Sequence, residues 1–181
     1  MAIKPIITLP DRRLRARSEP VGSVDAEVRK LMDDMLETMY DAPGIGLAAI
    51  QIAVPKRVVV LDVARREDEA AKPNPLFLAN PEILWASDEL SSMEEGCLSI
   101  PEYREEVFRP AKIKFAYLDR QGKRHEMDAE GLLATCVQHE IDHLNGILFI
   151  DHISRLKREM FLKKLTKTAK RADEPEAASG D

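Results

Sequence analysis

The segment that decides the interpretation of this sequence is QHEIDHLNG, residues 138–146, which contains the pattern His-Glu-x-x-His. On an α-helix, four residues give a net rotation of about 40° and a rise of about 6 Å, so His139 and His143 project from one face. Two such imidazoles suit two ligand positions of one metal ion, and Glu140 can reach a water molecule on that ion. The ion lowers the pKa of the water, and the carboxylate shuttles its proton.

A chance match on a polar helix is the alternative interpretation of this pattern. The apolar residues around it recur with helical spacing, which predicts that the helix is buried. They are Leu132, Leu133, Cys136, Val137, Ile141 and Leu144. Buried histidines and a buried carboxylate need a partner, so the burial favours a metal site.

A catalytic site of this kind usually has three protein ligands and an open position for water. The long zinc-protease pattern carries a histidine three residues after the glycine that Gly146 matches. This chain has Phe149 there, which excludes that class. Glu159 is a poor third ligand because it lies among lysines on a predicted surface helix. His152 remains an open candidate, although it suits a helix cap or a surface position equally well.

Two cysteines complete the set of candidate ligands. Cys136 lies three residues before His139 and therefore near the same helix face, but a cysteine on an apolar stripe ordinarily serves packing. Cys97 lies between two strand-like segments, in MEEGCLSIPEYR, residues 93–104. A glycine before it and a proline soon after predict a turn that could present a thiolate.

Length and composition predict one domain with a core of ordinary size. The chain has 181 residues, of which 44% are hydrophobic and 33% charged, and a net charge of −5. This charge does not favour DNA as a partner, and no apolar run is long enough to span a bilayer. The N-terminal residues do not resemble a signal peptide. With only two cysteines, we expect free thiols in a reducing cytoplasm. We also expect a monomeric protein without a membrane partner.

The rest of the pattern predicts an α+β arrangement, with a first helix, then antiparallel strands, then two further helices. The first helix covers residues 23–42, with Ser23 or Asp25 as its cap, and its methionine-rich stripe is expected to pack in the core. The predicted strands cover residues 56–63, 76–86, 103–110, 111–120 and 123–130. A polar loop is expected over 65–75, and Gly122 supplies a hairpin turn over 119–122.

Three segments together resemble the signature motifs of the peptide deformylases. They are GIGLAAIQ at residues 44–51, EGCLS at 95–99 and QHEIDH at 138–143. Each alone is modest support, but all three in this order are highly specific. The similarity extends over most of the chain, and the long C-terminal helix resembles the subtype common in Gram-negative bacteria.

The resemblance implies the peptide deformylase fold, in which antiparallel strands pack around a central metal-binding helix, with further helices at both ends of the chain. It implies a single catalytic domain over residues 1–170, and we expect a flexible polar tail over 171–181. It also implies removal of the N-formyl group from the initiator formyl-methionine of nascent polypeptides, with release of formate.

The same resemblance implies the roles of the site residues. The metal ligands would be Cys97, His139 and His143, binding Fe²⁺, with Ni²⁺, Co²⁺ or Zn²⁺ as substitutes. Metal-bound water or hydroxide would attack the formyl carbon with Glu140 as general acid and base. The side-chain amide of Gln51 and the backbone N–H of Leu98 would stabilise the oxyanion. A thiolate ligand also makes the site oxidisable.

Substrate binding is implied for a further set of residues. The backbone near Ile45 and Gly46 would pair with the peptide like an added strand. The methionine pocket and its borders would comprise Met93, Glu95, Leu132, Thr135, Cys136 and His139, and Gly96 would also bind the substrate. Thr135 departs from the bulkier aliphatic residue common at this position, which bears on the width of the pocket. Arg104 is expected to form an ion pair with Glu95 that holds the Cys97 loop, unless both are solvated charges.

Two other functions compete with the deformylase interpretation. One is a metallopeptidase that uses the same helix, and the other is a structural metal site or an inactive relative. Gln51 and Glu140 argue against the second, because neither is needed merely to hold a metal. The basic helix that begins near Ser154 has two interpretations as well. Most charged helix faces are simply solvated, whereas similar deformylases are proposed to dock on the ribosome near the exit tunnel.

Overall fold

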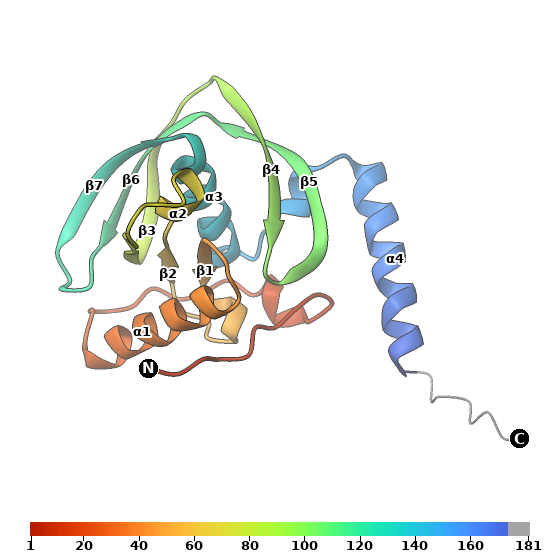
Figure 1. The fold of residues 1–181 in the computed structure, drawn as a ribbon, viewed down its shortest axis with the longest axis horizontal. Coiled ribbons are helices and arrows are strands. Elements are labelled where there is room, and N and C mark those ends of the chain that lie inside the picture. Colours follow the sequence, from red (N-terminus) through yellow and green to blue (C-terminus); the bar gives the residue numbers. More distant parts are fainter. Residues whose placement is uncertain (174–181) are drawn as a thin grey trace, which may run out of the picture.

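A central helix, α3 (Gly131–Leu144), lies between two antiparallel sheets in the computed structural model, which describes residues 1–173 (Figure 1). The larger sheet has five strands in the order β1 (Gly46–Ala48), β2 (Val58–Leu61), β3 (Leu76–Ala86), β6 (Lys112–Leu118) and β7 (Arg124–Glu130). The smaller sheet pairs β4 (Leu90–Cys97) with β5 (Ile100–Pro110). The predicted α+β class is confirmed.

All five predicted strands are present, and two further strands of the described residues, β1 and β4, were not predicted. The segment of β4 was not predicted as a strand, because LSSMEEGC is polar and half exposed and lacks the apolar alternation of a core strand. Its partner β5 begins three residues before the predicted strand. The expected polar loop contains a single helical turn, α2 (Ala64–Glu67). The hairpin turn before β7 is confirmed, with Gly122 at φ 81°.

The buried face of α3 packs against the five-stranded sheet. Val137 and Leu144 are fully buried in a core cluster that includes Val59, Leu78 and Phe115. The helix ends as predicted at the Asn145-Gly146 pair, where Gly146 has φ 72°. A rigid helix anchored in this way holds both histidines of the motif at fixed positions.

The first helix, α1 (Ala26–Asp41), covers β1 and β2. Of the two candidate caps, Asp25 is the one used, because its carboxylate accepts a hydrogen bond of 2.9 Å from the Val28 N–H. The stripe formed by Met32, Met35 and Met39 is fully buried. The predicted core role of these methionines is therefore confirmed.

The C-terminal helix, α4 (Arg155–Asp173), stands beside β5 and apart from the rest of the body (Figure 1). Phe161 stacks on Tyr103 of β5 with 4.3 Å between ring centroids, whereas Leu156 and Met160 are 68% and 63% exposed. The tail predicted for residues 171–181 begins inside this helix, and residues 174–181 lie outside the described part. Over residues 1–173, no helix is both long and apolar enough to cross a membrane.

Candidate metal centre and substrate cleft

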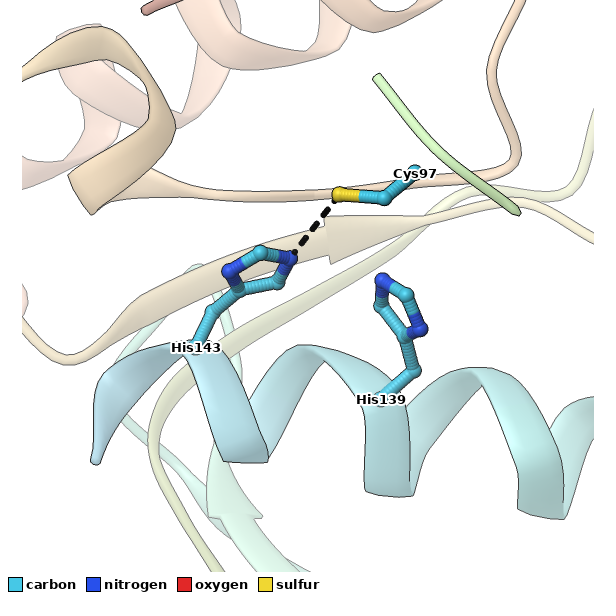
Figure 2. A group of neighbouring side chains, drawn as sticks. All are labelled: Cys97, His139 and His143. Atoms are coloured by element: carbon cyan, nitrogen blue, oxygen red, sulfur yellow. Dashed lines mark hydrogen bonds between the residues drawn. The ribbon is translucent and has the colours of Figure 1, made fainter. Parts of the chain in front are cut away.

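Cys97, His139 and His143 converge on one point between α3 and the end of β4 (Figure 2). One possible ligand atom from each side chain lies within 4.8 Å of the other two. The Cys97 Sγ is 3.3 Å from the His143 Nε2, and the two imidazole centroids are 5.1 Å apart. The structure thus brings together the sulfur and both imidazoles that the sequence proposed as ligands.

The remaining candidate ligands lie outside this group. The Cys136 Sγ–H donates to the backbone oxygen of Ile45 over 3.7 Å. His152 lies 2.8 Å from an oxygen of Asp142, and Glu159 forms an exposed ion pair with Arg155 on α4. Each of these side chains has a local partner.

Cys97 is presented by an irregularity in the pairing of β4 with β5. The regular register ends at Gly96, and Cys97 then lies opposite Ile100. Such a bulge redirects the side chain that follows it. The backbone N–H of Ser99 lies 3.4 Å from the Cys97 Sγ, so the chain after the bulge turns around the sulfur.

The chemistry of these three side chains fits a divalent transition metal. One sulfur and two imidazole nitrogens are the ligand types that such ions prefer, and three ligands leave a position open. The His139 Nδ1 is 2.9 Å from the Glu95 carboxylate, which orients the ring so that Nε2 faces the cluster. Burial lowers the pKa of His143 well below its usual value, which favours the neutral imidazole that binds metal.

His139 behaves differently when no metal is bound. Burial lowers its pKa, but hydrogen bonds to Cys97 and Glu95 outweigh burial and raise the pKa well above the usual range. A proton on this imidazole therefore competes with the metal, and metal binding releases it.

Behind His139 lies a buried network of charges. The Arg109 guanidinium, which is 5% exposed, donates to both Glu95 oxygens over 2.7 and 2.9 Å. It also donates to Asp142 over 2.8 Å, and Asp142 contacts His152. Burial raises the pKa of Glu95, but the hydrogen bonds from His139 and Arg109 outweigh it and lower the pKa to about 2.

The predicted ion pair between Glu95 and Arg104 is wrong. Arg104 instead pairs with Glu94, 3.1 Å away at the surface. The reason is the alternation of side chains along a strand. In the β4–β5 register Glu95 shares a sheet face with Arg109, whereas Arg104 lies opposite Gly96 and shares its face with Glu94.

Glu140 is buried in the wall of the site and is 4% exposed. One of its carboxylate oxygens, Oε2, has no hydrogen-bond partner within residues 1–173. Burial raises the pKa of this carboxyl group to about 7. Gly46 faces the other oxygen so closely that a Cβ atom there would lie 2.5 Å from it, which explains glycine at this position.

Gln51 lies in the 3₁₀ helix Ala49–Ile52 and is 1% exposed. Its Oε1 accepts a 2.9 Å hydrogen bond from the Ala48 N–H. Its amide nitrogen donates to the Ser99 hydroxyl over 3.1 Å and lies 3.5 Å from the Cys97 Sγ. The acceptor side is thus held by the backbone, and the donor side faces the ligand cluster.

These groups open into a cleft of about 630 Å³. The residues predicted to bind substrate or stabilise the oxyanion all line it, namely Ile45, Gly46, Gln51, Met93, Glu95, Gly96, Leu98, Arg104, Leu132, Thr135, Cys136 and His139. Two functional neighbours were missed, Arg109 and Ser99. Ser99 stands inside the EGCLS segment and could have been found there, whereas the partner of Glu95 required the strand register.

Comparison with known proteins gives one consistent result. The model of the polypeptide deformylase family matches residues 3–159. A peptide deformylase of Methylocella silvestris is 70% identical over 179 residues, covering 98% of this chain and 91% of the relative. A peptide deformylase of Nitrobacter hamburgensis is 62% identical, covering 95% of this chain and 99% of the relative.

Solved structures agree with the sequence relatives. The peptide deformylase of Ehrlichia chaffeensis in complex with actinonin has a TM-score of 0.85 and 43% identity, covering 93% of this chain and 98% of that chain. The Met-Ala-Ser-bound class I type b peptide deformylase of Acinetobacter baumannii has a TM-score of 0.78 and 37% identity, covering 84% of this chain and 99% of that chain.

Proposed function

We propose how the site works from the premise that this chain belongs to the peptide deformylase family, enzymes that remove N-formyl groups from nascent peptides. In the proposal, Glu140 moves the proton, Gln51 and the Leu98 backbone N–H stabilise the developing charge, and formate is released from formyl-methionine. The observation that carries it is the Glu140 carboxylate, which is buried beside the ligand cluster with one oxygen lacking a hydrogen-bond partner.

We propose Cys97, His139 and His143 as the ligands of one Fe²⁺ ion, with Ni²⁺, Co²⁺ or Zn²⁺ as substitutes. A divalent ion supplies Lewis acidity and an activated water molecule to a hydrolytic reaction. A thiolate also carries charge and is readily oxidised. We therefore expect the iron form to lose activity in air and the Ni²⁺ form to keep it. An iron enzyme that retains full activity after hours in air would contradict this assignment of the metal.

Glu140 suits the role of general acid and base. A carboxyl group with a pKa of about 7 exchanges its proton readily near neutral pH. As a carboxylate it would accept the proton of the attacking water, and as an acid it would return that proton to the leaving amine. Because Glu140 is buried, its proton passes between the attacking water and the leaving amine and is not lost to solvent.

Gln51 and Leu98 suit the stabilisation of an oxyanion. The Gln51 amide is held by the Ala48 N–H on its acceptor side, so its donor side stays turned towards the ligand cluster, where it now donates to the Ser99 hydroxyl. The backbone N–H of Leu98 follows directly after Cys97, beside the same cluster. Removal of one such donor typically slows a reaction by about 10²- to 10³-fold.

The cleft suits a peptide that binds as an added strand. β1 is the outer strand of the five-stranded sheet, and main-chain pairing along such an edge is independent of substrate sequence. Selectivity for methionine would then come from the apolar lining by Leu132, Met93 and Cys136. Thr135 is buried in the same wall, and its hydroxyl makes that part of the pocket less apolar than an aliphatic residue would.

The replacement Glu140→Ala tests the proposed general base. We expect the Ni²⁺-loaded variant to keep one metal ion per chain and to release formate about 10²- to 10⁴-fold more slowly than the unaltered enzyme. Glu89→Ala, at an exposed position before β4, is the matched control and should keep the full rate. Normal formate release by metal-loaded Glu140→Ala would refute the role of Glu140.

We also propose that α4 contacts the ribosome near its exit tunnel. Exposed lysines on this helix, Lys163, Lys164 and Lys167, support the proposal, because a basic surface attracts ribosomal RNA. Replacing all three with glutamate should weaken salt-sensitive binding to ribosomes in sedimentation experiments and spare activity on short peptides. Unchanged ribosome binding would remove the proposal. A cytoplasmic monomer also remains a prediction, and light scattering checks its oligomeric state.

A further inference from the structure

A second recess of about 450 Å³ adjoins the substrate cleft on the far side of the segment before β1. The two cavities share four lining residues, Pro43, Gly44, Ile45 and Arg66. This segment is therefore a thin partition, and Arg66 borders both spaces.

The recess is a built feature held by one buried carboxylate. Asp62 accepts hydrogen bonds from the Tyr40 hydroxyl at 2.5 Å and from the backbone N–H groups of Asn74 and Ala64 at 2.9 and 3.1 Å. The bond to Asn74 ties down the loop whose Pro73 forms one wall. The Asp62 carboxylate is thus occupied by hydrogen bonds within the protein.

The charge left over in the recess is positive. Arg65 and Arg66 are exposed, and neither side chain has an ion-pair partner within residues 1–173. By contrast, the other arginine that borders the cleft, Arg104, is paired with Glu94. The acidic residues that follow, 67–69, line neither cavity.

The segment that separates the two cavities leads into the reacting end of the cleft. Gly46 lies against Glu140, and Pro43 lies three residues earlier in the chain. The chain bends between Pro43 and Ile45, before β1 begins at Gly46. An extended peptide advances about 3.3 Å per residue, so its third or fourth residue would lie about 10 Å or more from the formyl group. Arg66, which lines the cleft as well as the recess, would be the basic side chain available to a carboxylate there.

We propose that Arg66 is a specificity-determining residue, which favours formylated peptides with a carboxylate at the third or fourth residue. The carboxylate can be an acidic side chain or the terminus of a short peptide. Arg65 adds to the positive potential of the recess. This inference rests on the proposed function, because it concerns the downstream part of the same substrate.

The test uses formate release from formyl-Met-Ala-Xaa-Ser and formyl-Met-Ala-Ser-Xaa amides, in which Xaa is aspartate or lysine. Formyl-Met-Ala-Ser with a free or an amidated terminus separates the two sources of carboxylate. An exposed charge pair predicts a roughly three- to five-fold higher kcat/KM for the carboxylate peptide. The preference should shrink as the salt concentration rises.

Each enzyme is described by the ratio of kcat/KM for two peptides, which cancels any general loss of activity. Arg66→Gln should abolish the preference and Arg66→Glu should reverse it. Arg17→Gln, an exposed arginine that lines neither cavity, should keep it. A kcat/KM ratio of one in the unaltered enzyme would overturn the inference, and so would a preference that survives in Arg66→Gln. Failure of every peptide to release formate would instead overturn the proposed function beneath it.

Discussion

Replacing Arg109 with methionine removes the central cation of the buried network behind His139. Methionine fills most of the space of the arginine stem but leaves Glu95 buried without its bidentate partner. Removing one member of a buried ion pair typically destabilises a protein by about 3–5 kcal/mol, because the other charge loses its partner. For a chain of this length each kcal/mol lowers Tm by about 2–4 °C, so we expect a fall of roughly 6–20 °C.

The assay is urea unfolding of the metal-free protein followed by far-ultraviolet circular dichroism, with calorimetry as a second measurement. Arg104→Met is the matched control, because its ion pair with Glu94 is at the surface and should contribute less than about 1 kcal/mol. Arg109→Met should also bind metal about 10- to 100-fold more weakly, since Glu95 no longer orients His139 firmly. Equal loss of stability in both variants would refute the network.

Three further predictions follow from the geometry. The pKa of Glu95 is lowered by its partners to about 2 in the folded protein. The carboxylate therefore contributes fully to the free energy of unfolding above its unfolded pKa of about 4.5, and this contribution is lost as the pH falls towards 2. The metal-free protein should lose on the order of 3 kcal/mol as the pH falls from 4.5 towards 2, and a urea midpoint that stays constant over this range would contradict the assignment. Gly46→Ala places a Cβ atom 2.5 Å from Glu140, and should slow formate release at least about tenfold with metal content unchanged; full activity would show that the contact relaxes freely. Gly146 has φ 72°, and a Cβ atom there would clash with the backbone oxygen of Arg15. Gly146→Ala should therefore lower the free energy of unfolding in urea by more than about 1 kcal/mol. Gly22→Ala, with open space around it, is its control and should be nearly neutral.

Features set by local periodicity could be predicted from the sequence. The apolar spacing of α3 and the methionine stripe of α1 identify buried helix faces, since helical geometry fixes which residues share a face. The turn at Gly122 follows from its freedom to adopt positive φ. Helical geometry likewise places the two histidines of the pattern His-Glu-x-x-His on one face of α3.

Features set by pairing between distant segments could not be predicted in this way. β4 is polar, and it is recognisable as a strand only through its partner β5. The partner of Glu95 depends on strand register, which separates Arg104 from Arg109 by face. Spacing within α3 left the third ligand open between Cys97, Cys136 and His152, and only the resemblance and then the fold brought Cys97 to the histidines.

The most direct test of the account is the product analysis of the Ni²⁺-loaded enzyme acting on formyl-Met-Ala-Ser. The account predicts one formate per peptide consumed, an intact Met-Ala-Ser product, and loss of the reaction when the metal is removed or when Cys97 is replaced by alanine. Release of free amino acids, or formate production that persists without metal and without Cys97, would contradict it.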